Sequence, residues 1–294
     1  MTKSVVVTGA ASGIGLATAL ELARAGFDVI GTVRTKEKAE TLREKAERIG
    51  AGVRTVILDD IADATSTVRA FTEIAELTDG GPWAVVNNAG IAQPGAIEDV
   101  DDEPARRQLE VNLVAPARIA RLVLPRMRER RSGRIVNISS ISGRVSMPFL
   151  GWYCASKHGL AALSDALRIE AAPFGVQVVL IEPGSYGTGI WERGVAMLPQ
   201  RRHSAYQDQY AAAEDVLRSA KNLPGPRPVA LAVLRALRAP RPRPRYLVGR
   251  GAVAQALFDA VAPTAATDWA KAVGTGLRTP PPRVARAMAR LRGR

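Results

Sequence analysis

A tyrosine and a lysine four residues apart, Tyr153 and Lys157, form the pattern in this sequence that most directly suggests acid-base chemistry. On a helix, this spacing puts both side chains on one face. A free phenol has a pKa near ~10, but an adjacent ammonium group favours the phenolate and lowers that pKa. Ser140 ends an apolar run upstream and could place its hydroxyl beside the phenol. Together these groups could move a proton to or from an alcohol or carbonyl oxygen.

The same spacing also occurs by chance on surface helices, so it does not by itself indicate a catalytic site. The first residues of the chain provide stronger evidence for a functional site. Residues 4–7 form a short β-branched run that is typical of a buried strand. The turn that follows contains Gly9, Gly13 and Gly15, and a helix-like stretch covers residues 14–25. Such a turn lets a pyrophosphate approach the backbone closely, and the helix N-terminus offers it free N–H groups. The spacing G-x-x-x-G-x-G differs from the usual G-x-G-x-x-G fingerprint.

Over residues 1 to about 250, the sequence resembles the short-chain dehydrogenase/reductase family, in its compact single-domain branch. The three residues between Gly9 and Gly13 argue against the longer branch of the family, whose glycine turn is one residue shorter. The motifs that carry the resemblance occur in the family's order and spacing, and they are Thr8-Gly9-x-x-x-Gly13-Ile14-Gly15, Asn87-Asn88-Ala89-Gly90, Asn112, Ser140, Tyr153, Lys157 and Pro183-Gly184.

The resemblance implies a catalytic role for four residues. Tyr153 would be the acid-base, and Lys157 would lower its pKa and bond the nicotinamide ribose. Ser140 would hold the substrate oxygen, and Asn112 would help to order a water that links Lys157 to solvent. The resemblance also implies a homodimer or a homotetramer.

The resemblance further implies a cofactor site around the glycine turn and the ends of later strands. An acidic residue is expected near the adenine, and the sequence does not separate Asp59 from Asp60, of which we favour Asp59. Besides Tyr153 and Lys157, the residues implied in cofactor binding are Thr8, Gly9, Ser12, Gly13, Ile14, Gly15, Asn88, Ala89, Gly90, Pro183, Gly184 and Thr188.

The choice of nicotinamide cofactor follows from the second predicted strand. An NAD enzyme needs an acidic residue near the end of this strand to accept hydrogen bonds from the ribose 2′-hydroxyl. Here Asp28 precedes the strand, and Val33 occupies the expected place. Arg34 follows, and a guanidinium pairs bidentately with a 2′-phosphate. The pattern therefore favours NADP(H) over NAD(H), although Lys36 and Lys38 also fit a solvated helix face.

Apolar runs that alternate with helix-like stretches predict a three-layer, doubly wound Rossmann fold with a seven-stranded, mainly parallel sheet. Ligands of such sheets bind beyond the carboxyl ends of the strands. The predicted strands are residues 5–7, 29–33, 54–58, 83–86, 135–138, 176–181 and 245–248, and the predicted helices are residues 14–25, 36–48, 64–77, 103–130 and 154–172.

A chain of 294 residues with 47% apolar residues is long enough to bury a core in one domain. No apolar run is long enough to span a bilayer, and residues 1–3 lead directly into a strand rather than a signal peptide. Cys154 is the single cysteine, and it fits a half-buried helix position better than a reactive thiol. His158 and His203 lack partners at metal-ligand spacing. We therefore expect a cytoplasmic enzyme without a metal.

Positive charge is concentrated towards the C-terminus. The net charge is +13; residues 1–226 carry 27 Lys/Arg and 26 Asp/Glu, whereas residues 227–294 carry 14 and 2. This basic segment could contact an anionic membrane surface, but a solvated terminus explains the charge more simply. The segment has few aromatic residues on which the bases of a single-stranded nucleic acid could stack. We divide the chain into a domain over residues 1–250 and a basic extension over residues 251–294, with helices expected at 253–261, 267–273 and 283–292.

The substrate is expected under a lid over residues 185–227, which is long for the resembling family. Apolar and aromatic residues in and near the lid suit a hydrophobic alcohol or ketone. The alternative is a non-catalytic NADP(H)-binding redox sensor whose basic tail contacts nucleic acid or membrane. The complete catalytic set favours the enzyme. The residues that suggest the apolar mouth are Phe149, Trp152, Trp191, Met197, Leu198, Tyr206 and Tyr210.

Overall fold

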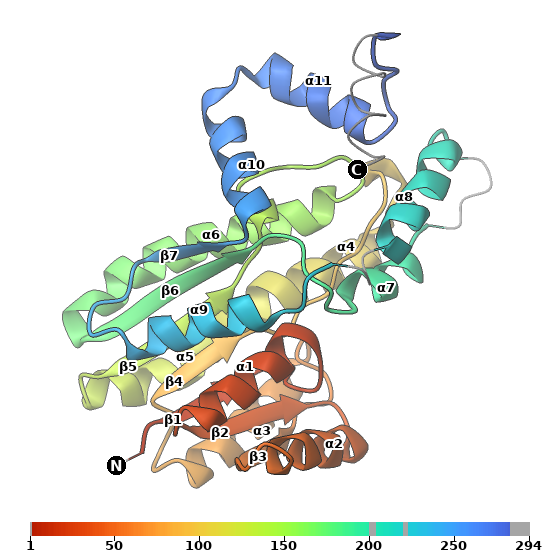
Figure 1. Cartoon of the computed structure of the whole chain (residues 1–294). Helices are drawn as coiled ribbons and strands as arrows, with labels where there is room; N and C mark the ends of the chain where they lie inside the picture. The colour runs from red at the N-terminus through yellow and green to blue at the C-terminus, as the bar shows by residue number, and fades with distance from the viewer. Residues whose placement is uncertain (1, 200–203, 220–222, 283–294) are drawn as a thin grey trace.

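Seven parallel strands form one sheet in the order β3-β2-β1-β4-β5-β6-β7 (Figure 1). The computed structural model describes residues 2–199, 204–219 and 223–282. The strand order reverses after β1, as in doubly wound folds. The predicted α/β class is confirmed. The strands are β1 Ser4–Val7, β2 Asp28–Val33, β3 Val53–Ile57, β4 Ala84–Asn87, β5 Gly133–Ile138, β6 Val176–Pro183 and β7 Arg245–Val248.

Helices cover both faces of the sheet, which explains the nearly continuous apolar runs in its strands. In β1, Val5 and Val7 belong to the core under α1, α2 and α9, whereas Val6 belongs to the core under α3, α5 and α6. All three valines are fully buried. The helices are α1 Gly13–Arg24, α2 Lys36–Glu47, α3 Ala64–Leu77, α4 Asp102–Leu109, α5 Ala115–Glu129, α6 Gly151–Ala171, α7 Ile190–Val195, α8 Gln207–Ser219, α9 Arg227–Arg238, α10 Arg250–Val261 and α11 Thr264–Gly274.

The predicted helix over residues 103–130 is interrupted. A π-helix, Glu110–Val114, separates α4 from α5. A π-turn inserts an extra residue into the helical ladder and commonly marks a functional site. Here it contains Asn112, one of the four predicted catalytic residues.

Helix α9 is a structural element that the sequence analysis missed. Prolines flank it, and Arg227, Arg235 and Arg238 are its only charged residues, so the segment reads as part of a basic tail. Its other face is apolar, with Val229 and Val233 fully buried against α1. The arginines lie on the solvent side because their charged ends remain in water.

Beyond β7 the chain forms α10 and α11, which extend away from the end of the sheet in Figure 1. Lys271 on α11 pairs with Asp259 on α10 at 2.6 Å. The predicted helices at 253–261 and 267–273 correspond to these two, and the one at 283–292 lies outside the described residues. None of the helices described is long and apolar enough to cross a membrane.

Candidate active site

One cavity of about 600 Å³ lies at the carboxyl ends of the strands. Most of the predicted site residues line this cavity, including Ser140, Tyr153 and Lys157. The exceptions are Asn112, Thr8 and Gly15, which are not among the lining residues. The predicted cofactor residues on its surface are Gly9, Ser12, Gly13, Ile14, Arg34, Asp59, Asn88, Ala89, Gly90, Pro183, Gly184 and Thr188.

The glycine turn is held open by close packing that only glycine permits. Gly9 and Gly13 have left-handed φ angles of 66° and 54°, which side chains rarely adopt. A Cβ atom on Gly15 would lie 2.3 Å from the Gly9 carbonyl oxygen. Behind the turn, the Thr8 hydroxyl oxygen accepts hydrogen bonds from the backbone N–H groups of Asn88 and Ala89, at 2.9 and 3.0 Å. Thr8 and Gly15 therefore shape the cradle from behind.

Tyr153 and Lys157 lie in the first turns of α6, both almost fully buried, as the four-residue spacing predicts. The Lys157 ammonium is 5.8 Å from the centre of the Tyr153 ring and donates a hydrogen bond to the Ile138 carbonyl at 2.9 Å. Ser140 follows β5, and its Oγ accepts a hydrogen bond from the Ser142 N–H at 3.1 Å. The end of β5 thus faces the start of α6, with the side chains predicted to be catalytic between them.

Burial is the main cause of the pKa shifts of Tyr153 and Lys157. Desolvation raises the pKa of Tyr153 to about 12, against a lowering contribution from the Ser140 hydroxyl. Desolvation also lowers the pKa of Lys157 to about 8. The expectation that Lys157 lowers the phenol pKa is therefore not met in this structure, because the ammonium is bonded to Ile138 and burial disfavours both charged forms.

Asn112 fixes the loop that follows β4. Its side-chain oxygen accepts a hydrogen bond from the Ile91 N–H, and its amide group donates to the Ile91 carbonyl, both at 3.0 Å. The amide also donates to Ser156 Oγ at 3.1 Å. A Cβ on Gly90 would lie 3.2 Å from the Asn112 oxygen and 3.9 Å from the Lys157 nitrogen. The loop therefore passes between the two side chains.

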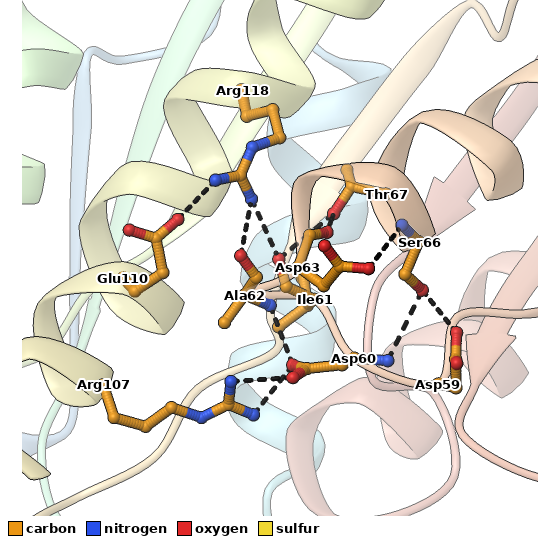
Figure 2. A network of polar contacts seen from close by, with 10 residues as sticks. All are labelled: Asp59, Asp60, Ile61, Ala62, Asp63, Ser66, Thr67, Arg107, Glu110 and Arg118. Carbon is orange, nitrogen blue, oxygen red and sulfur yellow. Dashed lines mark hydrogen bonds and ion pairs between the residues drawn. The ribbon is translucent and has the colours of Figure 1, made fainter. Parts of the chain in front are cut away.

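The other end of the cavity is lined by charged groups. Arg107 donates to both carboxylate oxygens of Asp60, at 2.8 and 2.7 Å (Figure 2). Asp59 pairs instead with Arg69 at 2.7 Å and with the Ser66 hydroxyl. Hydrogen bonds from Arg107 hold the pKa of Asp60 below its usual value, and those from Ser66 do so for Asp59. Both aspartates line the cavity, so their geometry leaves the choice at the adenine open.

Residues after β6 cover the cavity. Thr188 lies on the glycine turn, because a Cβ on Gly13 would be 3.0 Å from the Thr188 carbonyl oxygen. Trp191 packs edge-on against Tyr153, with ring centres 5.9 Å apart and an angle of 66°. Met197 also lines the cavity.

The other predicted mouth residues lie elsewhere. Phe149 makes edge contacts with Tyr206 and Tyr210, at 5.6 and 5.8 Å, in a separate cluster that also includes Leu198. Trp152 is not among the lining residues. The cluster of Phe149, Tyr206 and Tyr210 therefore packs the residues that follow β6 against the rest of the domain and does not line the cavity.

Several lining residues carry no motif and were not predicted, and those with a charged or phenolic side chain beside the predicted set include Arg107, Tyr186 and Arg193. Arg107 lies after the fourth strand and belongs to none of the sequence motifs that mark the glycine turn or the predicted catalytic residues. Tyr186 and Arg193 belong to the cover, whose sequence gives no repeat or spacing that would mark a ligand contact. Only the folded backbone brings the three to one cavity.

The glycine cradle fits a dinucleotide pyrophosphate, and the acid-base group beyond it fits an alcohol or a carbonyl compound. This combination defines a Rossmann-type oxidoreductase with a nicotinamide cofactor. The family described as short chain dehydrogenase matches residues 3–197. The chain belongs to the short-chain dehydrogenase/reductase family, whose enzymes act on alcohol and carbonyl groups.

Relatives of this family cover most of the chain. The uncharacterized oxidoreductase YusZ of Bacillus subtilis is 42% identical over 215 residues, which are 71% of this chain and 74% of that protein. Retinol dehydrogenase 16 of Mus musculus is 42% identical over 191 residues, 64% of this chain and 58% of that protein. A short-chain dehydrogenase from Streptomyces avermitilis superposes with a TM-score of 0.76 at 31% identity, covering 95% of this chain and 98% of that one.

Solved relatives contain both kinds of nicotinamide cofactor. The short-chain dehydrogenase from Sphingobium yanoikuyae, in complex with NADPH, is 25% identical with a TM-score of 0.68 and covers 88% of this chain and 93% of that one. The enzyme from Burkholderia phymatum, in complex with NAD, is 25% identical with a TM-score of 0.76 and covers 87% and 92%. The family relationship therefore establishes a nicotinamide cofactor without choosing between the two.

Proposed function

We propose that this protein is an NADP(H)-dependent oxidoreductase that moves hydride between the nicotinamide and a hydrophobic alcohol or ketone. The observation that carries the proposal is that Tyr153 shares one cavity with the glycine turn and with Arg34. The same wall presents Ser140 and Lys157. A substrate oxygen at Tyr153 would then lie within the space that also holds the cofactor.

In the reducing direction, the Tyr153 hydroxyl donates its proton to the carbonyl oxygen while the carbon accepts hydride. A nicotinamide cofactor, when bound, would supply that hydride. A pKa of about 12 keeps Tyr153 protonated at neutral pH, which is the form this step requires. Ser140 donates a hydrogen bond to the same oxygen, and Lys157, whose pKa is about 8, lies beside the phenol to return a proton to it.

Asn112 is proposed to support this return of protons. Its amide holds Ile91 and Ser156, so the loop at Gly90 remains beside the Lys157 ammonium. The role expected from the family resemblance, ordering a water next to Lys157, is compatible with this position. Asn112 would act through the loop and the water without contacting the substrate.

Arg34 supports the preference for NADP(H). Val33 is buried where an NAD enzyme would carry an acidic residue, and the exposed Arg34 follows it into the cavity. The backbone N–H groups around Gly9 and Gly13 would hold the pyrophosphate, and Arg34 would hold the 2′-phosphate. We retain Asp59 as the proposed residue near the adenine, with Asp60 as the alternative.

The apolar cover supports a hydrophobic substrate. Trp191, Ile190 and Met197 line the cavity, and Trp191 packs edge-on against Tyr153. A relative is named retinol dehydrogenase 16, and another is named 17-beta-hydroxysteroid dehydrogenase type 6, both after large apolar alcohols. We propose the same class of substrate for this chain, in a cytoplasmic enzyme that assembles as a homodimer or a homotetramer.

Fluorescence titration with NADPH and with NADH tests the proposal. We expect NADPH to bind more tightly, and Arg34→Ala to weaken NADPH roughly 10- to 100-fold with little effect on NADH. Turnover of a series of ketones of increasing apolar size should then increase with NADPH as the reductant. Equal loss of both cofactors in Arg34→Ala would refute the assignment of Arg34 to the 2′-phosphate.

A further inference from the structure

Arg193, on the covering helix α7, brings a second guanidinium to the cavity end where Arg34 lies. Both residues line the cavity, but they come from opposite sides, Arg34 from the end of β2 and Arg193 from the cover. Arg193 Nη1 would be 3.5 Å from a Cβ on Gly189, so its head folds back over the start of α7. The adjacent Thr188 is the residue that lies on Gly13. The head of Arg193 is thus held above the cofactor turn.

Acidic side chains act on the two guanidinium groups only through space: Glu192 on Arg193, and Asp60 with Arg34. Within the described part of the chain, neither Arg34 nor Arg193 forms an ion pair or a side-chain hydrogen bond. Asp60 feels the charge of Arg34, but both of its carboxylate oxygens are already bonded to Arg107. Two unpaired like charges in one cavity are a site for an anion.

Electrostatics agrees with this geometry. Arg193 is exposed as a whole, yet its pKa is lowered, first through desolvation and then through repulsion by Arg34. The charge of Glu192 acts in the opposite direction and offsets part of this repulsion. An anion between the two guanidinium groups would remove the repulsion and accept forked hydrogen bonds from both.

We infer that Arg193 is the second arm of the 2′-phosphate site, so that a phosphate on the ribose holds the cover closed over the cavity. The inference rests on the proposed NADP(H) preference and adds a specificity-determining residue on the cover. Arg34 would recognise the phosphate from the sheet, and Arg193 would close onto it. A cofactor without the phosphate would bind to the turn but would leave Arg193 unpaired.

Adenosine 2′,5′-bisphosphate and adenosine 5′-monophosphate are the probes, because they differ in the 2′-phosphate and lack the nicotinamide. By calorimetry, Arg193→Gln should weaken the bisphosphate roughly 5- to 50-fold and the monophosphate less than about two-fold. Arg193→Lys should retain part of the affinity. Arg106→Gln removes an exposed arginine that does not line the cavity, and it should change neither. A double variant with Arg34→Ala should lose less than the product of the single losses, because both residues share one ligand.

Hydrogen exchange provides a second measurement on the same proteins. The bisphosphate should protect the amides of residues 187–198, and the monophosphate should not; Arg193→Gln should abolish that protection. Equal weakening of both probes in Arg193→Gln would place Arg193 on the shared 5′-phosphate and overturn the inference, as would no weakening. If the wild-type protein itself did not prefer the bisphosphate, the assignment of Arg34, and with it the proposed cofactor preference, would fail first.

Discussion

The two ends of the cavity differ in how their charged groups are satisfied. At the catalytic end, Tyr153 and Lys157 are only 5% exposed, and the ammonium is bonded to the Ile138 carbonyl. At the other end, Arg34 is exposed and unpaired among the described residues, and Arg193 meets it from the cover. The charged groups of the first end are satisfied within the protein, whereas we propose that an anion pairs with those of the second.

This difference separates two tasks. A proton-transfer group must be held in a fixed geometry, and burial tunes its pKa before any ligand arrives. An anion site gains affinity from charges that are still unpaired when the ligand binds. The catalytic end should therefore tolerate substitution poorly in rate, and the anion end should respond mainly in affinity.

Tyr153→Phe should have the largest effect. Removing the hydroxyl eliminates the proton donor but keeps the ring that packs against Trp191, so turnover should fall about 10²- to 10⁴-fold. NADPH affinity should remain within about two-fold of wild type, since the anion end is unchanged. Steady-state rates and fluorescence titration on the same preparation measure the two quantities. Normal turnover in this variant would remove Tyr153 from the mechanism.

The sequence predicted the elements that depend on local pattern. All seven strands were placed within two residues at each end, because β-branched runs buried on both faces leave a clear signal. The four-residue spacing also placed Tyr153 and Lys157 together on one helix. Helix α9 was missed, because arginines on its outer face and flanking prolines conceal the apolar stripe.

Features of the site that arise from tertiary packing could not be predicted. The direction of the Tyr153 pKa shift depends on complete burial, which no spacing reveals. Arg193 lines the same cavity as Arg34 only because α7 lies beside the glycine turn. The π-turn at Asn112 likewise has no propensity signal of its own.

Burial of Lys157 should make stability depend on pH in a defined direction. Its pKa in the folded protein is about 8, below the ordinary 10.5, so between these values the folded state binds fewer protons than the unfolded state. Wild-type stability should therefore rise with pH across this window relative to Lys157→Met, by about 3 kcal/mol at most. Urea unfolding of both proteins between pH 7.5 and about 10 measures the difference, and a constant difference would show that the ammonium is not desolvated.

Removing the Tyr210 hydroxyl should weaken the attachment of the residues that cover the cavity. The Ala96 N–H donates to the Tyr210 hydroxyl at 2.9 Å, and that hydroxyl donates to Asp99 at 2.5 Å. Tyr210→Phe keeps the contact with Phe149 but leaves the amide without its acceptor, at a cost of about 1–3 kcal/mol. Exchange of the Ala96 amide should accelerate about 5- to 100-fold. Tyr206→Phe removes a hydroxyl from another ring of the same cluster, and it should leave the Ala96 amide protected.

The smallest expected effect concerns Arg107, which neutralises Asp60 beside the anion end. Arg107→Gln should leave the Asp60 carboxylate ionised, because Arg34 also lowers its pKa, and the freed charge should then repel a 2′-phosphate. The ratio of NADPH to NADH affinity should fall about two- to five-fold, the size expected for a half-exposed ion pair.

Two companions sharpen the test of Arg107. Adding Asp60→Asn to Arg107→Gln should restore the ratio, because the repelling charge is gone. Arg106→Gln, the neighbouring exposed arginine that pairs with Asp102, should not change it. If the double variant failed to restore the ratio, Arg107 would act on the phosphate directly, and the anion site would contain three guanidinium groups instead of two.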